Sequence, residues 1–441
     1  MRLRILGAAV CALVLILSSA MPGVAESRSP APTGAAPAAV GLSGVSAIAA
    51  GGNHTCAIME SGAVRCWGNN AYGQLGDSTM TNRALPVEVV GLGESVTAIA
   101  AGVYHTCALT ASGGVKCWGW NQYGQLGNAS TATSSVPVNV SGLSSGVVGI
   151  AAGWAHTCAV TAGGAVKCWG WNVLGELGDG TLANSTTPVN AVGLSGPVTT
   201  IELGADHTCA RLATGSVVCW GFNESGQVGD NTTISRPTPV SVVGLASGAQ
   251  SIALGALHTC ARTPADGAVC WGANSYGQVG NSSTTSQLTP ANVTGLSNGV
   301  LAVSAAGFHS CALLTGGALK CWGYNDAGQL GDATTSDRSA PVSVLGLGGP
   351  VTAVAAGDSH TCAITASGGV KCWGLNSSGQ LGDGTNTGRT EPVDVLGLTE
   401  SPTATPTRTP TRTQTPTRTP TPKAITPVSR VYLPVILWNR P

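Results

Sequence analysis

The chain has 441 residues, in which 20 Lys and Arg balance 20 Asp and Glu. The balance is uneven, because residues 42–398 hold 11 basic and 18 acidic residues, a net charge of −7. A body this acidic, with no basic stripe, would repel a phosphate backbone, so we expect no nucleic-acid partner.

Residues 1–25 are predicted to form a secretory signal peptide. Two arginines precede an apolar run over residues 5–17, and small residues before Glu26 offer a cleavage site. This layout is typical of an export signal rather than of a membrane span. We therefore expect a secreted or cell-surface protein, in which residues 26–41 lead into the folded part.

Residues 42–398 contain seven copies of one unit. The histidines recur every 51 residues, and so do the tryptophans of a Cys-Trp-Gly motif. A fixed period of this kind indicates one supersecondary unit copied along the chain. The histidines are His54, His105, His156, His207, His258, His309 and His360.

The second unit predicts four short strands. Residues 96–102 form an apolar run that ends at a glycine, and residues 105–110 and 114–119 flank an Ala-Ser-Gly turn. A fourth strand is expected at 137–140, where the leading Pro137 suits the start of an edge strand. Seven such sheets bury both faces when they pack radially, which predicts an all-β, seven-bladed β-propeller with four antiparallel strands per blade. The alternative, an open solenoid, would need polar capping units.

Two ways of closing the ring remain open from the sequence. Residues 37–42 resemble the fourth strand of a unit, so an N-terminal strand would complete the last blade. Alternatively, the fourth strand at 392–396 completes that blade unaided.

Fourteen of the 15 cysteines form pairs ten residues apart, one pair in each unit. If the hairpin turn of the second unit centres on Ser112, Cys107 and Cys117 face each other at a Cα separation of ~4.5–5.5 Å, within reach of a disulfide. Export permits oxidation, so we expect one disulfide in each blade, with reduced, packed cysteines as the alternative. The expected pairs are Cys56–Cys66, Cys107–Cys117, Cys158–Cys168, Cys209–Cys219, Cys260–Cys270, Cys311–Cys321 and Cys362–Cys372.

The phrase GVYHTCALTASGGVKCWGWNQYGQLG, residues 102–127, recurs with variations in all seven units. It resembles the repeat of the regulator of chromosome condensation family, and the resemblance implies a seven-bladed propeller. The family's name also implies guanine-nucleotide exchange on a nuclear GTPase and chromatin binding. An exported, acidic chain departs from both requirements, so we expect neither activity. The paired cysteines fit a secreted, bacterial-type version of this scaffold that serves for binding.

The repeated polar residues predict no metal or cofactor. Each unit supplies one His and two Cys, fewer than the four ligands that zinc usually takes. The Gly-Asp-Gly-Thr phrases at 178–181 and 382–385 lack the spaced carboxylates that calcium prefers. We expect each histidine to hydrogen-bond backbone at a blade junction, and Asn121 and its equivalents to stabilise turns.

No catalytic residues are predicted, because every histidine is a scaffold position and no nucleophile, base and orienting group stand apart from the repeat. Acidic residues outside the repeat pattern include Glu202, Asp206 and Asp358. A polysaccharide lyase or hydrolase would have to use these carboxylates, and that enzyme is the alternative to a binding protein.

Ten aromatic residues fall where the units differ: before the repeated His, two residues after the repeated Trp, and before Gly-Gln-Leu-Gly. Equivalent slots lie at one height in adjacent blades, so units 2 to 4 would form an aromatic patch typical of recognition surfaces. The other interpretation is that these aromatic side chains only fill the space between blades. The predicted binding residues are Tyr104, Trp120, Tyr123, Trp154, Trp171 and Phe222. We predict a monomeric scaffold that binds an extracellular protein or polysaccharide; a non-specific adhesin is a further alternative.

Residues 399–427 form a Thr/Pro-rich linker that cannot build a core. The tail at 428–441 includes the apolar stretch VYLPVILW, far short of the ~20 residues of a spanning helix. Two interpretations remain: attachment of the protein to the cell envelope through this tail, or a disordered end.

Overall fold

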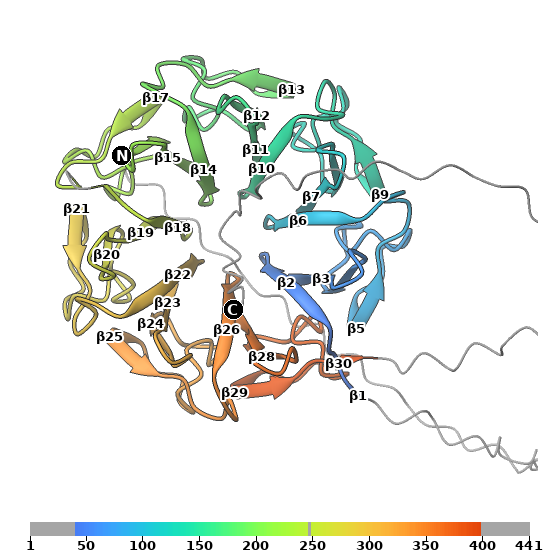
Figure 1. The fold of residues 1–441 in the computed structure, drawn as a ribbon, viewed down its shortest axis with the longest axis vertical. Coiled ribbons are helices and arrows are strands. Elements are labelled where there is room, and N and C mark those ends of the chain that lie inside the picture. Colours follow the sequence, from blue (N-terminus) through green and yellow to red (C-terminus); the bar gives the residue numbers. More distant parts are fainter. Residues whose placement is uncertain (1–39, 246–247, 398–441) are drawn as a thin grey trace, which may run out of the picture. The chain divides into compact units, whose positions relative to one another are not determined.

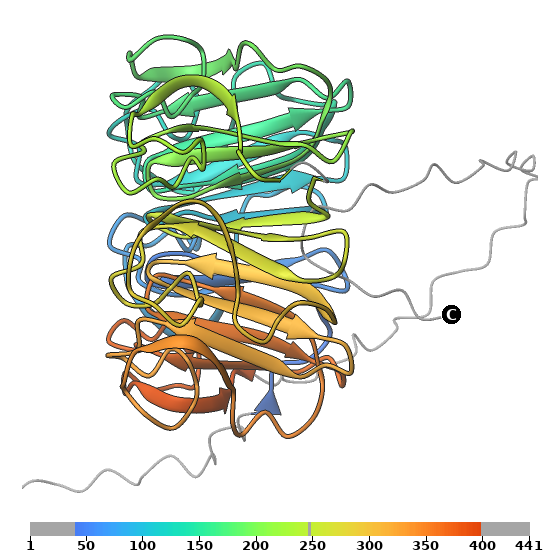
Figure 2. The same ribbon diagram turned by 90° about the vertical axis from the view of Figure 1, so that its left-hand side faces the viewer.

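The computed structural model describes residues 40–245 and 248–397 as seven four-stranded antiparallel sheets around one axis (Figure 1). Figure 2 shows the same ring from the side. The predictions for residues 1–25, 26–39, 399–427 and 428–441 lie outside these ranges. The described residues contain no helix, and therefore none long and apolar enough to cross a membrane. The predicted seven-bladed propeller is confirmed.

Each blade is a meander of four strands, numbered from the axis outward (Figure 1). The innermost strands are β2 (Val45–Ala50), β6 (Val96–Ala101), β10 (Val147–Ala152), β14 (Val198–Leu203), β18 (Ser251–Leu254), β22 (Val300–Ala306) and β26 (Val351–Ala356). The second strands are β3 (His54–Met59), β7 (His105–Thr110), β11 (His156–Thr161), β15 (His207–Leu212), β19 (His258–Arg262), β23 (His309–Leu314) and β27 (His360–Thr365).

The third strands are β4 (Val64–Gly68), β8 (Val115–Gly119), β12 (Val166–Gly170), β16 (Val217–Gly221), β20 (Ala268–Gly272), β24 (Leu319–Gly323) and β28 (Val370–Gly374). The outer strands are β5 (Arg83–Glu88), β9 (Ser134–Asn139), β13 (Ser185–Asn190), β17 (Arg236–Ser241), β21 (Gln287–Asn292), β25 (Arg338–Ser343) and β29 (Arg389–Asp394). Blades 1 to 7 begin with β2, β6, β10, β14, β18, β22 and β26 respectively.

The outer strand differs from the prediction in its bounds. β9 begins at Ser134, three residues before the predicted start, and Pro137 lies inside the strand. Opposite Pro137 the register shifts, because Cys117 pairs with Val138 whereas Gly119 pairs with Ser134. A proline has no N–H for the ladder and is tolerated on an edge strand at such an irregularity. The edge position is therefore confirmed and the predicted starting proline is wrong.

The central hairpin of each blade places its two cysteines directly opposite each other. Cys107 on β7 pairs with Cys117 on β8, and the two Cα atoms lie 4.1 Å apart. All seven predicted disulfides are present, one in each blade. Each closes a short loop that belongs to a single hairpin, so the disulfides stabilise blades individually and the packing between blades holds the ring together.

The hydrophobic core consists of seven clusters, and each lies between two neighbouring blades. Between blades 1 and 2, Trp118 packs with the Cys56–Cys66 disulfide and Leu75, and all of these side chains are fully buried. The repeated Trp therefore belongs to the junction with the preceding blade rather than to its own sheet alone. A single blade could not bury this surface, which is the physical reason that the repeats form a closed ring.

A repeated set of hydrogen bonds crosses every junction. His54 Nε2 lies 2.9 Å from Thr106 Oγ1 in the next blade, and Thr106 Oγ1 donates to the Gln74 carbonyl oxygen at 2.8 Å. Trp118 Nε1 donates to the same carbonyl at 2.9 Å. Because the hydroxyl proton is used on the carbonyl, Nε2 must be the protonated donor of the neutral imidazole.

The predicted backbone partner of the histidines is therefore wrong, although their place at the blade junction is right. The partner is a Thr hydroxyl of the next blade, or a Ser hydroxyl in the case of Ser310. Sequence spacing could not reveal it, because the two residues lie 52 positions apart. Burial lowers the pKa of six of these imidazoles to about 3, and that of His360 to about 4.

The ring closes with the same contacts as the other junctions. His360 Nε2 lies 2.8 Å from Thr55 Oγ1, and Trp67 Nε1 donates to the Gln380 carbonyl oxygen at 2.9 Å. β29 completes blade 7 unaided, as the second closure alternative predicts. The N-terminal segment adds a separate two-stranded pairing, β1 (Val40–Gly41) with β30 (Leu396–Gly397).

Candidate functional site

One face of the ring carries the three variable slots. The loop between β6 and β7 and the segment after β8 lie at the same end of the blade, because Trp120 N donates to the Tyr104 carbonyl oxygen at 2.9 Å. The equivalent bonds in other blades include Trp171 to Ala155 and Phe222 to Asp206. Side chains that vary from unit to unit are therefore presented together, as the sequence predicts.

Six aromatic side chains of blades 1 to 3 form one continuous group on this face. Ring centroids are 5.4 Å apart for Tyr72 and Tyr104, 5.6 Å for Tyr104 and Trp120, and 5.8 Å for Trp120 and Trp154. Five of the eight ring pairs are edge-to-face, an arrangement that aromatic rings prefer, and the other three are tilted. We call this group the aromatic ridge; its members are Tyr72, Tyr104, Trp120, Tyr123, Trp154 and Trp171.

The ridge differs from the predicted set by two residues. Tyr72 joins it through Tyr104, and its side chain is 39% exposed. The sequence contained this signal, since Tyr72 occupies the slot of Tyr123 one unit earlier. Phe222 makes no ring contact with the ridge within the described part of the chain, because its slot in blade 4 has no aromatic neighbour to bridge the gap. The remaining five predicted residues lie together.

A second aromatic cluster lies on blades 5 and 6. Tyr276 is 5.5 Å from Phe308 and 4.8 Å from Tyr324 between ring centroids. Tyr324 Oη donates to Asp326 Oδ2 at 2.9 Å, and this hydrogen bond raises the pKa of the Tyr324 phenol. The second aromatic cluster uses the same three slots as the ridge, so it belongs to the same face of the ring.

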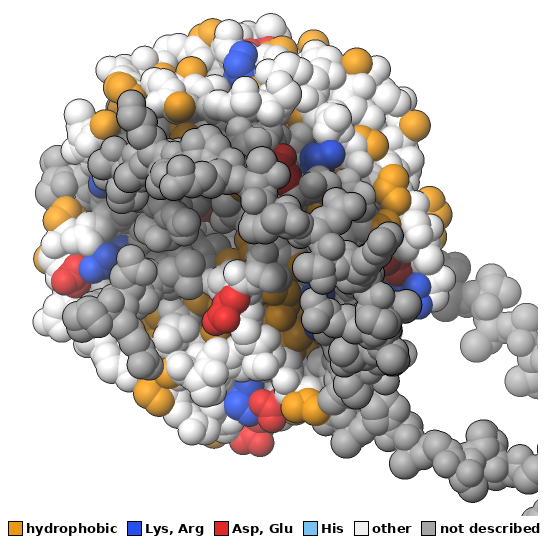
Figure 3. Space-filling model, turned by 45° about the vertical axis from the view of Figure 1, so that its right-hand side comes forward, with side chains coloured by type: hydrophobic (Ala, Val, Ile, Leu, Met, Phe, Trp, Pro, Cys, Tyr) orange, Lys and Arg blue, Asp and Glu red, His pale blue; other side chains and the backbone are white. Residues whose placement is uncertain are grey.

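The inner strands enclose a central channel of about 630 Å³. Figure 3 shows hydrophobic side chains within the hollow of the ring and only scattered charged ones around it. Tyr104 and Trp154 of the ridge, together with all three members of the second aromatic cluster, also line this cavity. The channel and the aromatic face are therefore continuous.

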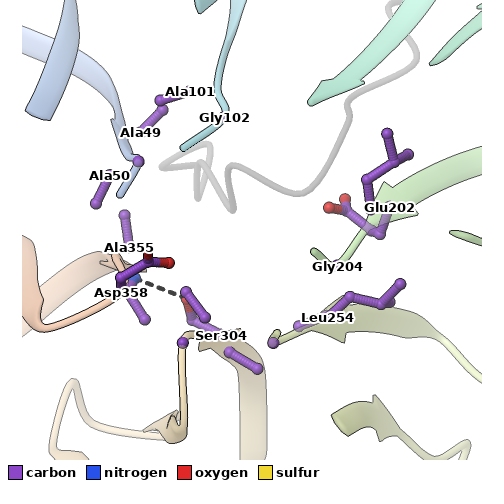
Figure 4. A pocket seen from close by; sticks show the side chains of 18 of the residues that line it. Ala49, Ala50, Ala101, Gly102, Glu202, Gly204, Leu254, Ser304, Ala355 and Asp358 are labelled. Atoms are coloured by element: carbon purple, nitrogen blue, oxygen red, sulfur yellow. Dashed lines mark hydrogen bonds between the residues drawn. The ribbon is translucent and has the colours of Figure 1, made fainter. Parts of the chain in front are cut away.

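Glu202 and Asp358 are the charged side chains among the residues that line the channel. They come from blades 4 and 7, and Figure 4 shows their carboxyl groups directed into the cavity from opposite walls. Burial raises the pKa of Glu202 to about 8 and that of Asp358 to about 6. Asp206, the third off-pattern acid, is not part of the lining, so the three acids do not form one catalytic cluster.

Glu176 replaces the Gln that the other six units carry in Gly-Gln-Leu-Gly or Gly-Gln-Val-Gly. Its side chain is fully buried, and Oε2 accepts from Leu174 N at 2.9 Å while Oε1 has no hydrogen-bond partner among the described residues. Burial, with a smaller contribution from the charge of Asp206, raises the pKa of Glu176 to about 7. The protonated form of the acid, which the raised pKa favours, can occupy this position in place of the amide.

The repeated Asn and Asp side chains organise turns, as predicted. Asn121 Nδ2 donates to the carbonyl oxygens of Ser130 and Ala132 at 3.0 and 2.9 Å. In the Gly-Asp-Gly-Thr phrase at 178–181, Asp179 Oδ1 accepts from the backbone and hydroxyl of Thr181. Over the ranges that the structure describes, no group of three or more His, Cys, Asp or Glu could hold a metal ion.

The fold and this face define a β-propeller that displays variable loop residues on a repeated frame. The chain belongs to the family of regulator of chromosome condensation (RCC1) repeat proteins. The family's repeat models match all seven units and, together, most of the propeller. One of them covers residues 45–74, 96–125, 147–176, 198–227, 249–278, 300–329 and 351–380.

Two curated relatives carry this repeat in proteins of very different length. The ultraviolet-B receptor UVR8 of Arabidopsis thaliana is 32% identical over 359 residues, which cover 80% of this chain and 82% of the receptor. The human E3 ubiquitin-protein ligase HERC2 is 34% identical over 276 residues, which cover 61% of this chain and 6% of the ligase. The second similarity therefore concerns one small part of a much larger protein.

Solved structures share the fold. Yeast RCC1 (Prp20), solved with Kap60 bound to it, matches with a TM-score of 0.67 at 22% identity over 78% of this chain and 83% of that chain. Human WBSCR16 matches with a TM-score of 0.68 at 22% identity, covering 76% of this chain and 93% of that chain.

Proposed function

We propose that this protein is an exported scaffold that binds another protein through the aromatic ridge. The observation that carries the proposal is the continuous contact of six aromatic rings on one face. The slot of Trp120 and Trp171 holds Asn69 in unit 1 and Ala273 in unit 5. A frame that accepts Asn and Ala there does not need large rings for packing. Aromatic residues are enriched at the energetic centres of protein interfaces.

The relatives support protein as the ligand class. The yeast protein with this fold is described bound to Kap60 and for its binding to Gsp1p and histones. The predicted signal peptide and the seven disulfides favour an extracellular partner for this chain. Polysaccharide is the other ligand class that an aromatic surface would suit, and the binding assay includes it. We further propose a monomeric scaffold.

A capture experiment tests the proposal. The intact chain is immobilised without reductant and exposed to secreted proteins and envelope polysaccharides of the source cells. A parallel column carries Trp120→Ala, Trp154→Ala and Trp171→Ala together. The matched control removes three aromatics from the same face elsewhere: Tyr276→Ala, Phe308→Ala and Tyr324→Ala.

The expected result is a protein retained by the unmodified chain and the control but lost from the ridge variant. Equal retention by all three columns would exclude the ridge as the binding surface. Retention of polysaccharide alone would change the ligand class. If no column retains a ligand, the enzyme alternative is favoured. Turnover of polysaccharide by the unmodified chain would then be compared with turnover by Glu202→Gln and Asp358→Asn. Thermal unfolding without reductant verifies that each variant is folded.

A further inference from the structure

The central channel has a chemical character of its own, distinct from the aromatic ridge. Its wall is built mainly from Ala and Gly of the inner strands and the loops that follow them. At the position of Glu202, the other six units carry small residues. These are Ala49, Ala100, Ala151, Ala253, Ser304 and Ala355. A carboxylate at this height is therefore a departure from the repeat and not a requirement of the fold.

Asp358 is a departure of the same kind on the opposite wall. The other units place no carboxylate at its position, which holds Gly52, Val103, Trp154, Ala205, Ala256 and Gly307. Blades 4 and 7 are as far apart as two blades of a seven-membered ring can be, and Figure 4 shows the two carboxyl groups facing the same space. The channel therefore presents one acid from each side across an apolar interior.

Neither carboxyl group faces a counter-charge within the described part of the protein. No Lys, Arg or His is among the residues that line the channel, and neither acid has a hydrogen-bond or ion-pair partner among the described residues. Ser304, which also lines the channel, accepts a hydrogen bond at Oγ from Ala356 N at 3.0 Å. An unpaired carboxylate on an apolar wall is costly unless a partner is supplied from outside.

We propose that the central channel binds an alkyl diammonium ion, with one ammonium group at Glu202, the other at Asp358 and the methylene chain against the alanine wall. A volume of about 630 Å³ is within the usual range for small-molecule sites. Tyr104 and Trp154, which line the channel and belong to the aromatic ridge, are side chains of the kind that attract cations. This inference does not depend on the partner proposed for the ridge.

Other cations fit the channel less well. Calcium takes 6–8 oxygen ligands, whereas this cavity offers two carboxylates on opposite walls and no third acid. A single Lys or Arg side chain of a partner protein would neutralise one carboxylate and leave the other unpaired. Burial already raises the pKa of both groups, so a dication that pairs with both would stabilise their ionised forms together.

Isothermal titration calorimetry of the intact chain at low salt tests the site. The probes are putrescine, cadaverine and hexamethylenediamine, with butylamine as the singly charged reference and calcium chloride as the metal. The second ammonium should improve affinity at least about tenfold over butylamine, since a hydrogen bond to a charged group contributes ~1.5–3 kcal/mol and each 1.4 kcal/mol is about tenfold. One chain length should bind best, because the two carboxylates are held by a rigid ring.

Glu202→Gln and Asp358→Asn should each reduce the affinity for the best diamine to that of butylamine. Glu88→Gln, the same charge change on the exposed side of β5, should leave it unchanged. Both channel variants keep the shape of the side chain and replace a carboxyl group that has no counter-charge among the described residues, so they are expected to fold. The chain-length series in the unmodified protein does not depend on them. Equal binding of diamines and butylamine, unchanged binding by Glu202→Gln, or tighter binding of calcium would overturn the proposal.

Discussion

The hydrogen bonds that cross each blade junction should make a measurable contribution to stability. Thr106→Val removes the hydroxyl that joins His54 to the Gln74 carbonyl while keeping the shape of the side chain. The carbonyl retains Trp118 Nε1 as a donor, but His54 loses its partner at Nε2, and its Nδ1 has no partner among the described residues. A buried donor left unsatisfied costs roughly 1–3 kcal/mol, so we expect a loss of about 2 kcal/mol.

The assay is equilibrium unfolding in guanidinium at neutral pH with the disulfides intact. Thr97→Val is the matched control, because Thr97 is exposed on β6 and its hydroxyl bonds only the Leu109 carbonyl at 3.2 Å. Its effect should stay within about 0.5 kcal/mol, as for most surface changes. Thr106→Ser should keep the junction bond, since Ser310 makes it naturally at 2.8 Å. Equal effects of Thr106→Val and Thr97→Val would refute this account of the junction.

Three further predictions concern the buried histidines, two glycines with positive φ and the pairing of the cysteines. The imidazoles stay neutral in the fold, with the pKa lowered from 6.5 to about 3 in six of them and to about 4 in His360, so folding stability is lost as pH falls below 6.5. Below pH 4.5, the ordinary pKa of Glu, protonation of the acids with raised pKa no longer offsets this loss. Each of the six histidines with a pKa of about 3 then lowers the free energy of unfolding by about 1.4 kcal/mol per pH unit, a steep decline that near-ultraviolet circular dichroism would detect as unfolding. An unchanged signal from pH 4.5 to 3.5 would contradict this prediction. Gly127→Ala should lower the thermal unfolding temperature more than Gly142→Ala, although both glycines have a positive φ (67° and 70°). A Cβ at Gly127 would lie 2.7 Å from Trp169 Nε1, whereas one at Gly142 would contact nothing within 4 Å. Equal losses would mean that only backbone strain matters. Cys11 is expected to be removed with the signal peptide, so thiol titration of the exported, denatured, unreduced protein should find no free cysteine. More than one free thiol per chain would contradict full pairing of the other fourteen cysteines.

The sequence alone determined the architecture and the disulfide pairing of this protein. Both are local consequences of the repeat: a 51-residue period copies one sheet, and a hairpin centred on Ser112 brings Cys107 and Cys117 into register. The variable aromatic slots were also readable, because equivalent positions of a repeat lie at equivalent heights.

Only the tertiary structure decided which of those residues meet. Contacts between blades join residues that are far apart in the sequence, such as His360 and Thr55, and their geometry depends on the angle between sheets and on side-chain rotamers. The positions of side chains in neighbouring blades also decide that Phe222 does not contact the ridge. The tertiary structure also brings Glu202 and Asp358 to one channel, because ring closure around a common axis makes opposite blades face each other.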